Sequence, residues 1–220
     1  MILLGIISKK KPGMEQISTP LENIKEAYIE INHETGNLAI HSISSNNKLL
    51  IGEFNGGINY DVVTIEDRAY FKLRIPTESN LRKGLWKYCS GTRLDWDIGL
   101  NSQIKISLHL VNKTDTIDLN LANLHLEEIS LDLAANNAVI RLPHNLNNLK
   151  IKSLISIVEV IVPKDRQVSI QVENGINMIN IDRERFSKER RGRYQSIDYE
   201  GSENQIEIIV ETNLSMIKIR

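Results

Sequence analysis

The chain has 220 residues, of which 41% are hydrophobic and 25% are charged, and its 27 basic residues nearly balance its 28 acidic ones. A net charge of -1 gives no overall attraction to nucleic acid or to an anionic membrane, so any such binding must be local. The single cysteine, Cys89, excludes an intrachain disulfide. Because no base lies near it in the sequence, we interpret it as a small buried apolar side chain rather than a nucleophile.

An apolar and basic tail is predicted over residues 1–20. Its apolar run ends near Ile7 and is much shorter than the roughly 20 residues that span a bilayer. It also differs from a secretory signal, because the lysines follow the apolar run and no small-residue cleavage site comes after it. The segment is either a strand or tail that caps the fold, or an interfacial segment with three lysines facing anionic headgroups: Lys9, Lys10 and Lys11. We therefore expect a cytoplasmic protein, free or peripheral to the membrane.

From Leu21 onward apolar and polar residues alternate, with the period of two that is typical of half-buried strands. Strands predicted at 28–32 and 38–41 flank a Glu-Thr-Gly-Asn turn at 34–37. Only 81–88 carries a weak helical pattern.

The second half of the sequence repeats itself. The strand pattern at 129–133 recurs at 149–152, and Pro143 is followed by Pro163, both at a spacing of 20 residues. A further copy at 168–172 begins 19 residues after Leu149. Similar alternating segments lie at 104–108, 117–121, 206–208 and 217–219.

This spacing predicts an all-β fold, a single-chain β-solenoid whose coils each hold about 20 residues in two short strands. One coil cannot bury its own apolar row, so coils stack and their Ile, Leu and Val side chains form ladders. A β-sandwich is the competing fold, because its strands recur at shorter intervals, but the even spacing favours the solenoid. The predicted domain covers 21–220, with an N-terminal part at 21–100 and regular coils at 101–220.

No catalytic, cofactor-binding or metal-binding residue is predicted. Asp115, Asp118 and Asp132 are the nearest approach to a carboxylate cluster, but their positions in strands and turns are those of solvated side chains. The histidines lack metal-ligand spacing, and neither a phosphate-binding glycine loop nor a nucleophile elbow is present. The histidines are His33, His41, His109, His125 and His144.

One strongly basic segment, 183–193, holds six basic and two acidic residues, a local net charge of +4. A solvated loop is the simplest interpretation. The functional alternative is a docking patch for anionic lipid, an acidic partner or nucleic acid. Nucleic acid is not expected, because Phe186 is the segment's only aromatic residue and stacking platforms use several. The candidate partner-binding residues are Arg183, Arg185, Lys188, Arg190, Arg191 and Arg193.

Several segments of the chain resemble the toastrack domains of bacterial envelope-stress proteins, such as the C-terminal domain of the LiaF type and modules that accompany PspC proteins. The opening strand at 21–31, the Leu-Gly-Phe-containing segment at 49–54 and the Trp-bearing segment at 94–101 are similar to that layout. The most specific match is the tail, at 194–199 and 204–210.

The resemblance implies a non-enzymatic interaction or scaffold domain in envelope-stress sensing or signalling, with a membrane or signalling protein as its partner. Two alternatives remain open. A β-solenoid enzyme acting on envelope glycans predicts carboxylates of adjacent coils converging on one groove. A surface adhesin module requires export from the cell.

Overall fold

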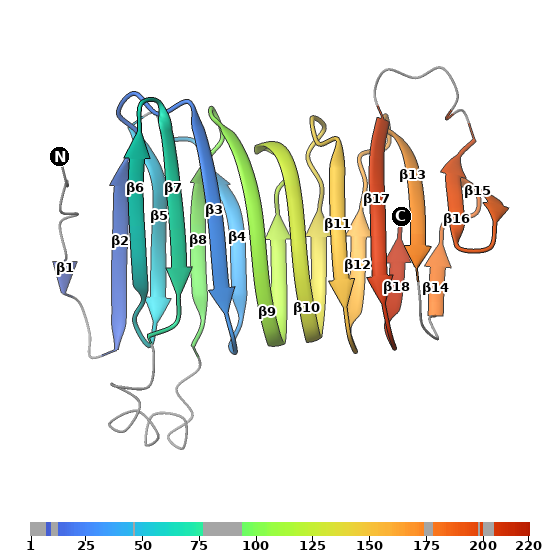
Figure 1. Ribbon diagram of the computed structural model, residues 1–220, viewed down its shortest axis with the longest axis horizontal. Helices are drawn as coiled ribbons and strands as arrows, with labels where there is room; N and C mark the ends of the chain where they lie inside the picture. The colour runs from blue at the N-terminus through green and yellow to red at the C-terminus, as the bar shows by residue number, and fades with distance from the viewer. Residues whose placement is uncertain are drawn as a thin grey trace.

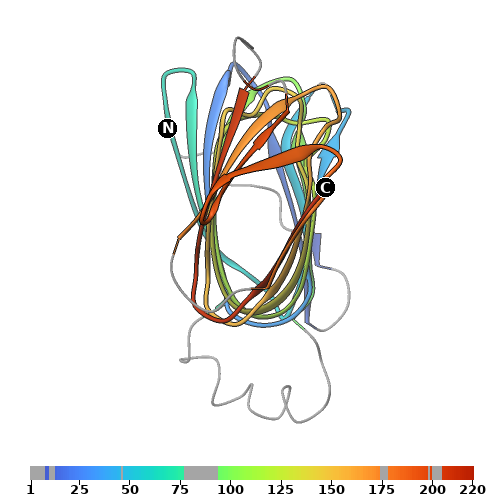
Figure 2. The same cartoon turned by 90° about the vertical axis from the view of Figure 1, so that its right-hand side faces the viewer.

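A computed structural model describes residues 8–9, 13–45, 47–76, 94–173, 178–197, 199 and 205–220. Within these ranges the regular structure is entirely β-strand, and the strands form one continuous hydrogen-bonded ladder. The ladder winds into a flattened solenoid with two walls, seen from the side in Figure 1 and along its axis in Figure 2. The predicted all-β solenoid is confirmed.

The first wall, called the first face below, is parallel in its centre and antiparallel at both ends. Its end hairpins are β6–β7 and β15–β16. In spatial order its strands are β6 (Asn59–Ile65), β7 (Arg68–Arg74), β3 (Glu26–His33), the first half of β9 (Lys105–Asn120), the first half of β10 (His125–Arg141), β11 (Asn148–Ser153), β17 (Gln205–Thr212), β13 (Gln167–Glu173), β16 (Arg193–Ser196) and β15 (Phe186–Arg190).

The second wall, the second face, begins with antiparallel strands and continues in parallel. In spatial order its strands are β1 (Ser8–Lys9), β2 (Met14–Pro20), β5 (Lys48–Asn55), β8 (Trp96–Asn101), β4 (Leu38–Ile43), the second halves of β9 and β10, β12 (Ile157–Ile161), β18 (Met216–Ile219) and β14 (Met178–Ile181).

The 20-residue spacing predicted from the sequence is the register of one coil on the next. Ile129 lies opposite Leu149 and Leu131 opposite Ile151 in the parallel pairing of β10 with β11. Inward-facing side chains at equal positions form apolar ladders, for example Ile31, Leu110, Leu131, Ile151 and Val210 in successive coils, each almost completely buried. Burial of apolar area at about 25 cal/mol per Å² makes these ladders the main stabilising feature of the fold.

The coils are not stacked in sequence order. The pair β17/β18 lies between β11/β12 and β13/β14, and the pair β3/β4 lies between β7/β8 and β9. Every coil has the same alternation of apolar and polar residues. The spacing of the repeats therefore cannot show which coils lie next to each other. The out-of-order pairs leave the hairpins β6–β7 and β15–β16 outermost on the first face. There they pair with the outermost parallel strands, whose backbone groups would otherwise form an open edge.

Residues 14–20, assigned to the tail from the sequence, form β2 and pair with β5 along its whole length. The tail therefore ends earlier than expected, because Ile17 of this strand is buried in the core. The segment Met1–Ile7, the lysines Lys10 and Lys11, the weak helix at 81–88 and Cys89 lie outside the described residues.

No helix in the described part of the chain is long and apolar enough to cross a membrane.

Candidate functional site

The first face carries a hollow of about 710 Å³ on its outer surface, between β6 and β10. Tyr28 of β3 and Tyr70 of β7 lie opposite each other in the parallel ladder and both point outward. Their rings stack, with centroids 5.0 Å apart and an angle of 7° between the ring planes. Tyr28 is 36% exposed and Tyr70 is 38% exposed. We call this hollow, with its two tyrosines, the tyrosine face.

The next outward row of the tyrosine face is charged. Lys72 of β7 forms an ion pair with Glu30 of β3, with Nζ 2.8 Å from Oε1. The hydrogen bond from Lys72 lowers the pKa of the Glu30 carboxyl, although desolvation acts in the opposite direction. His109 and Ser130 continue this row on β9 and β10. The face thus combines exposed aromatic rings with fixed polar groups, the composition of a binding surface.

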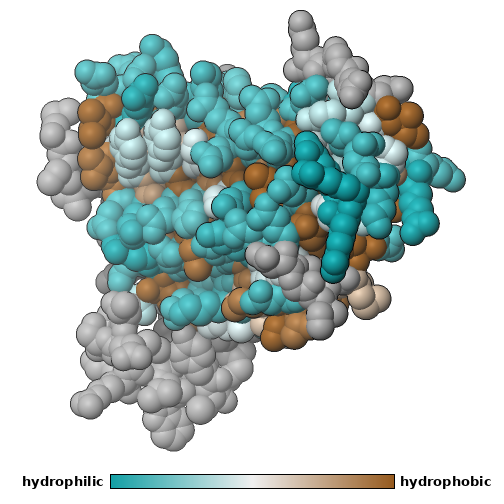
Figure 3. All heavy atoms as spheres, turned by 45° about the vertical axis from the view of Figure 1, so that its right-hand side comes forward, coloured by the Kyte–Doolittle hydropathy of each residue, from teal (hydrophilic) through white to brown (hydrophobic). Residues whose placement is uncertain are grey.

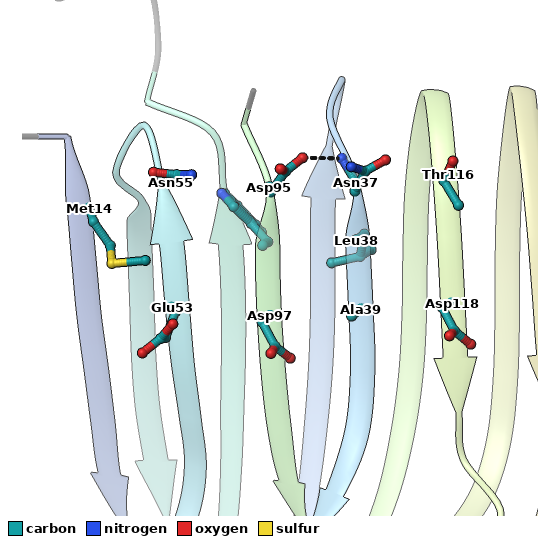
Figure 4. A pocket seen from close by; sticks show the side chains of 11 residues that line it. Met14, Asn37, Leu38, Ala39, Glu53, Asn55, Asp95, Asp97, Thr116 and Asp118 are labelled. Carbon is teal, nitrogen blue, oxygen red and sulfur yellow. Dashed lines mark hydrogen bonds between the residues drawn. The ribbon is translucent and has the colours of Figure 1, made fainter. Parts of the chain in front are cut away.

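A second hollow, of about 300 Å³, lies on the second face (Figure 4). Three carboxylates, Glu53 of β5, Asp97 of β8 and Asp118 of β9, lie in one row across it, and the small side chain of Ala39 lies between the last two. At the rim, the Asn37 backbone N–H donates to Asp95 Oδ1 at 2.9 Å. We call this site the acidic hollow.

Each carboxylate of the acidic hollow has a partner of its own. The Gln16 amide donates to Glu53 Oε1 at 2.7 Å. His41 Nδ1 lies 3.1 Å from Asp97 Oδ1, and Arg141 Nη1 lies 2.5 Å from Asp118 Oδ1. Within the described ranges, no group of three or more His, Cys, Asp or Glu side chains is arranged to hold a metal ion.

The three aspartates singled out from the sequence do not come together. Asp118 faces the acidic hollow, whereas Asp132 lies on the opposite wall, between Val111 and Lys152. Asp115 forms the corner of β9 with a φ of 76°, and its Oδ2 accepts hydrogen bonds from the Gly36 backbone N–H at 2.7 Å and the Thr35 hydroxyl at 2.9 Å. Its role is therefore to hold a turn.

The histidines are likewise dispersed. His41 pairs with Asp97 on the second face, His109 lies on the tyrosine face and His125 is exposed at the start of β10. His144 Nδ1 lies 3.1 Å from Asp165 Oδ1 in an exposed turn.

His33 differs from the others because it is completely buried. Its Nε2–H donates to the Leu94 carbonyl at 2.8 Å, which leaves Nδ1 to accept from the Asn112 amide at 2.7 Å. Its ring also packs against Trp96, with centroids 4.8 Å apart. Burial lowers the pKa of the imidazole, so the neutral ring is the form that fits this environment.

The basic segment is a β-hairpin, formed by β15 and β16 at the C-terminal end of the first face (Figure 1), and not the solvated loop of the simplest interpretation. We call residues 183–196 the basic hairpin. Phe186 buries the first position of β15, the rest of that strand is exposed, and Gly192, with a φ of 75°, forms the turn that leads into β16. The backbone N–H of Val172 donates to the Gly192 carbonyl at 2.7 Å, which ties the hairpin tip to β13.

The structure separates Arg185 from the other five candidate cations. The Arg185 guanidinium is partly buried, donates to the carbonyls of Val162 at 3.0 Å, Arg166 at 3.0 Å and Pro163, and lies 5.0 Å from the centroid of the Phe186 ring. Burial lowers its pKa. Arg185 thus ties the start of the basic hairpin to the connection between β12 and β13. The remaining candidates are more open to solvent: Arg183, Lys188, Arg190 and Arg191 are exposed and Arg193 is half-buried.

Sequence reasoning missed the tyrosine face and the acidic hollow. Tyr28 and Tyr70 both occupy the outward phase of alternating strands, which was visible, but only the pairing of β3 with β7 brings them together. Figure 3 shows how hydrophilic side chains dominate the visible surface, with apolar residues between them.

Residues 7–161 match a family model described as the N-terminal domain of toast_rack, DUF2154. The chain belongs to this toast-rack family. The resemblance inferred from the sequence is thereby confirmed at the level of the family. No curated protein matches this toast-rack chain.

Solved structures extend the comparison to nearly the whole toast-rack chain. One, described as a "putative cell adhesion protein" from Clostridium sporogenes ATCC 15579, is 21% identical, with 95% of this chain and 99% of that chain covered and a TM-score of 0.81. At that identity the two proteins share a fold.

Two further structures are more distant. A "putative adhesin" from Bacteroides fragilis NCTC 9343 is 11% identical, covers 97% of this chain and 98% of its own, and has a TM-score of 0.28. A "putative lipid binding protein" from Parabacteroides distasonis ATCC 8503 is 8% identical, covers 94% and 97%, and has a TM-score of 0.22. Neither score supports an argument about this chain.

Proposed function

We propose that this toast-rack chain is a non-catalytic interaction domain that acts as a scaffold in bacterial envelope-stress sensing or signalling. In this proposal it works in the cytoplasm, is related in role to the LiaF type, and contacts the membrane peripherally through Lys9, Lys10 and Lys11. Its partner is a membrane or signalling protein, and nucleic acid is not a partner.

The observation that carries the proposal is the tyrosine face. It offers two exposed stacked rings, Tyr28 and Tyr70, beside the fixed ion pair of Glu30 and Lys72, on strands whose inner sides are anchored in the core. Aromatic residues next to fixed polar groups are enriched where proteins bind other proteins. The wall does not need to rearrange in order to present them.

The basic hairpin supports the same proposal as a second contact region. Its exposed cations Lys188, Arg190 and Arg191 lie at the C-terminal end of the first face, away from the tyrosine face. A cationic edge of this kind attracts an acidic partner and resists accidental strand pairing.

The test is capture of partners in cells under envelope stress, by crosslinking and mass spectrometry with the full chain as bait. We expect envelope proteins to be captured by the wild type and lost with Tyr28→Ser/Tyr70→Ser. Arg190→Glu/Arg191→Glu tests the hairpin, and Lys164→Glu, an exposed turn residue, serves as the charge control. Unchanged capture of every protein by both double variants would exclude docking through these surfaces.

The proposal includes the absence of catalysis, and the acidic hollow provides its test. Convergent carboxylates are what a glycan-cleaving enzyme requires, but those of the hollow are held by Gln16, His41 and Arg141. We expect no release of reducing ends from purified peptidoglycan. Release by the wild type that is lost in Asp118→Asn would replace the proposal with an enzyme.

A surface adhesin module is the second candidate. The fold shared with the Clostridium sporogenes "putative cell adhesion protein" favours it. The two roles differ in location, so protease treatment of intact cells separates them. Digestion of the native protein from outside would establish the adhesin, whereas protection would support the cytoplasmic role.

A further inference from the structure

A row of outward side chains crosses the tyrosine face in register. It runs from Tyr70 on β7 through Tyr28 on β3 and Ser107 on β9 to Glu128 on β10. Neighbouring strands lie about 4.8 Å apart, close to the 5.0 Å between the two ring centroids. The stack of rings therefore advances by one ring per strand, and it stops at Ser107, where the side chain is too small to continue it.

The space above Ser107 is the next position in this stack. One ring face of Tyr28 is covered by Tyr70, and the other is directed toward the neighbouring strand, β9, and the hollow. The far side of the position is occupied by Glu128, which lines the same hollow. A flat group placed over Ser107 would thus contact a tyrosine ring on one side and a carboxylate on the other.

The electrostatics of this position are negative. Glu30 is neutralised by Lys72, but the exposed Glu128 side chain has no ion pair or hydrogen bond within the part of the chain that the structure describes. The adjacent Glu127 pairs instead with Lys105, at 3.2 Å between Oε1 and Nζ. The faces of aromatic rings also carry partial negative charge. A flat cation satisfies all of these features.

We propose that the position above Ser107 binds the guanidinium group of an arginine side chain presented by the protein partner. This inference rests on the proposed docking function and specifies the chemistry of the partner. A guanidinium is planar and positively charged, so it can stack on the Tyr28 ring while the carboxylate on the other side attracts its charge. A lysine ammonium supplies the charge without the plane, and a neutral sugar ring supplies the plane without the charge.

The experiment is an NMR titration of the full chain with the tripeptide amide acetyl-Gly-Arg-Gly. The same peptide with citrulline, which keeps the shape and loses the charge, and with lysine serve as ligand controls. We expect the arginine peptide to shift the Ser107 and Glu128 amide signals, with the citrulline and lysine peptides binding about tenfold more weakly.

The protein variants are matched in the same way. Glu128→Gln should weaken the arginine peptide about tenfold, while Glu127→Gln, one residue away and outside the hollow, leaves it unchanged. Ser107→Tyr should fill the position and abolish the shifts, with an otherwise native spectrum as evidence of folding.

Equal binding of the citrulline and arginine peptides would overturn the proposal, as would equal effects of the two glutamate variants. Shifts of the same signals by methyl β-glucoside, without any by the arginine peptide, would assign the position to a sugar instead. Failure here is distinguishable from failure of the docking function. Loss of cellular partners in Tyr28→Ser/Tyr70→Ser, together with unchanged capture by Glu128→Gln, would keep docking and discard the arginine.

Discussion

Asn112 and Asn136 are joined side chain to side chain inside the solenoid, where Asn136 Nδ2 donates to Asn112 Oδ1 at 2.6 Å. The chain of contacts continues in both directions. Asn112 reaches His33, and the Asn136 backbone N–H donates to the Ser156 hydroxyl at 3.1 Å. The Ser156 N–H in turn donates to the Ser215 hydroxyl at 3.1 Å. All five residues are buried, so this polar ladder links successive coils where the chain turns from one face to the other.

Replacing a central member of the ladder should be costly. In Asn136→Ala the buried oxygen of Asn112 loses its donor, and we expect the free energy of unfolding to fall by about 1–3 kcal/mol. Urea denaturation measures the change. Asn137→Ala is the matched control, because Asn137 is exposed and should change stability by less than about 0.5 kcal/mol. A similar decrease in the free energy of unfolding in both variants would show that the buried hydrogen bond between Asn136 and Asn112 does not stabilise the fold.

The buried His33 should make the fold sensitive to mild acid. Its pKa is lowered in the folded chain, whereas the unfolded chain has the ordinary value of 6.5. Below pH 6.5 the unfolded chain therefore binds more protons, and the free energy of unfolding decreases as the pH falls. The slope is limited to about 1.4 kcal/mol per pH unit for one group.

The measurement is urea denaturation across the range from about pH 7 to pH 5, above the region where ordinary carboxyls titrate. We expect His33→Gln to lose most of this slope, even though it is less stable at neutral pH. His125→Gln, on the exposed start of β10, should retain the slope of the wild type. If His33→Gln left the pH dependence of the free energy of unfolding unchanged, another group would be responsible for the acid sensitivity.

Two arginines of the basic hairpin should differ sharply in their effect on stability. Arg185→Gln removes the donors to the carbonyls of Val162, Pro163 and Arg166 and should cost about 1–3 kcal/mol. The exposed Arg191, replaced by Gln, should change stability by less than about 0.5 kcal/mol. Thermal unfolding distinguishes the two. Equal effects would mean that the bonds of Arg185 to the connection between β12 and β13 do not stabilise the fold.

Gly192 should control how firmly the basic hairpin is attached. Its φ is +75°, and a Cβ there would lie 2.5 Å from the Val172 carbonyl oxygen. In Gly192→Ala we expect the hairpin tip to separate from β13 while the central coils remain intact. Hydrogen exchange should then accelerate at 186–196 and stay unchanged at 129–133. Unaltered protection of the hairpin would show that the turn tolerates the methyl group.

The sequence allowed the central coils to be predicted, because the match of Ile129 with Leu149 is a direct image of parallel stacking. The position of β17 between β11 and β13 could not be predicted, since its alternation fits any coil equally well. The tyrosine face could not be predicted from the sequence for a related reason. Tyr28 and Tyr70 are ordinary outward residues until the order of strands is known.

The polar ladder could not be predicted from the sequence for a different reason. Asn112 and Asn136 lie inside the long strands β9 and β10, at positions where the sequence offers asparagines that resemble turn or surface residues. Their burial follows from the corner that each strand makes between the two faces. By contrast, the basic segment was recognised by its charge, but the inward role of Arg185 required the structure.

The insertion of β17/β18 between β11/β12 and β13/β14 has a consequence for biosynthesis. While the polypeptide is still emerging from the ribosome, β13 and β14 have been made but lack the parallel neighbours to which they belong. Only when 205–219 appears can this end of the protein close, by entering a place between two segments already synthesised. Folding at this end is therefore delayed until nearly all of the described chain has been translated, and until then the β11/β12 edge is open to a chaperone or to a wrong strand.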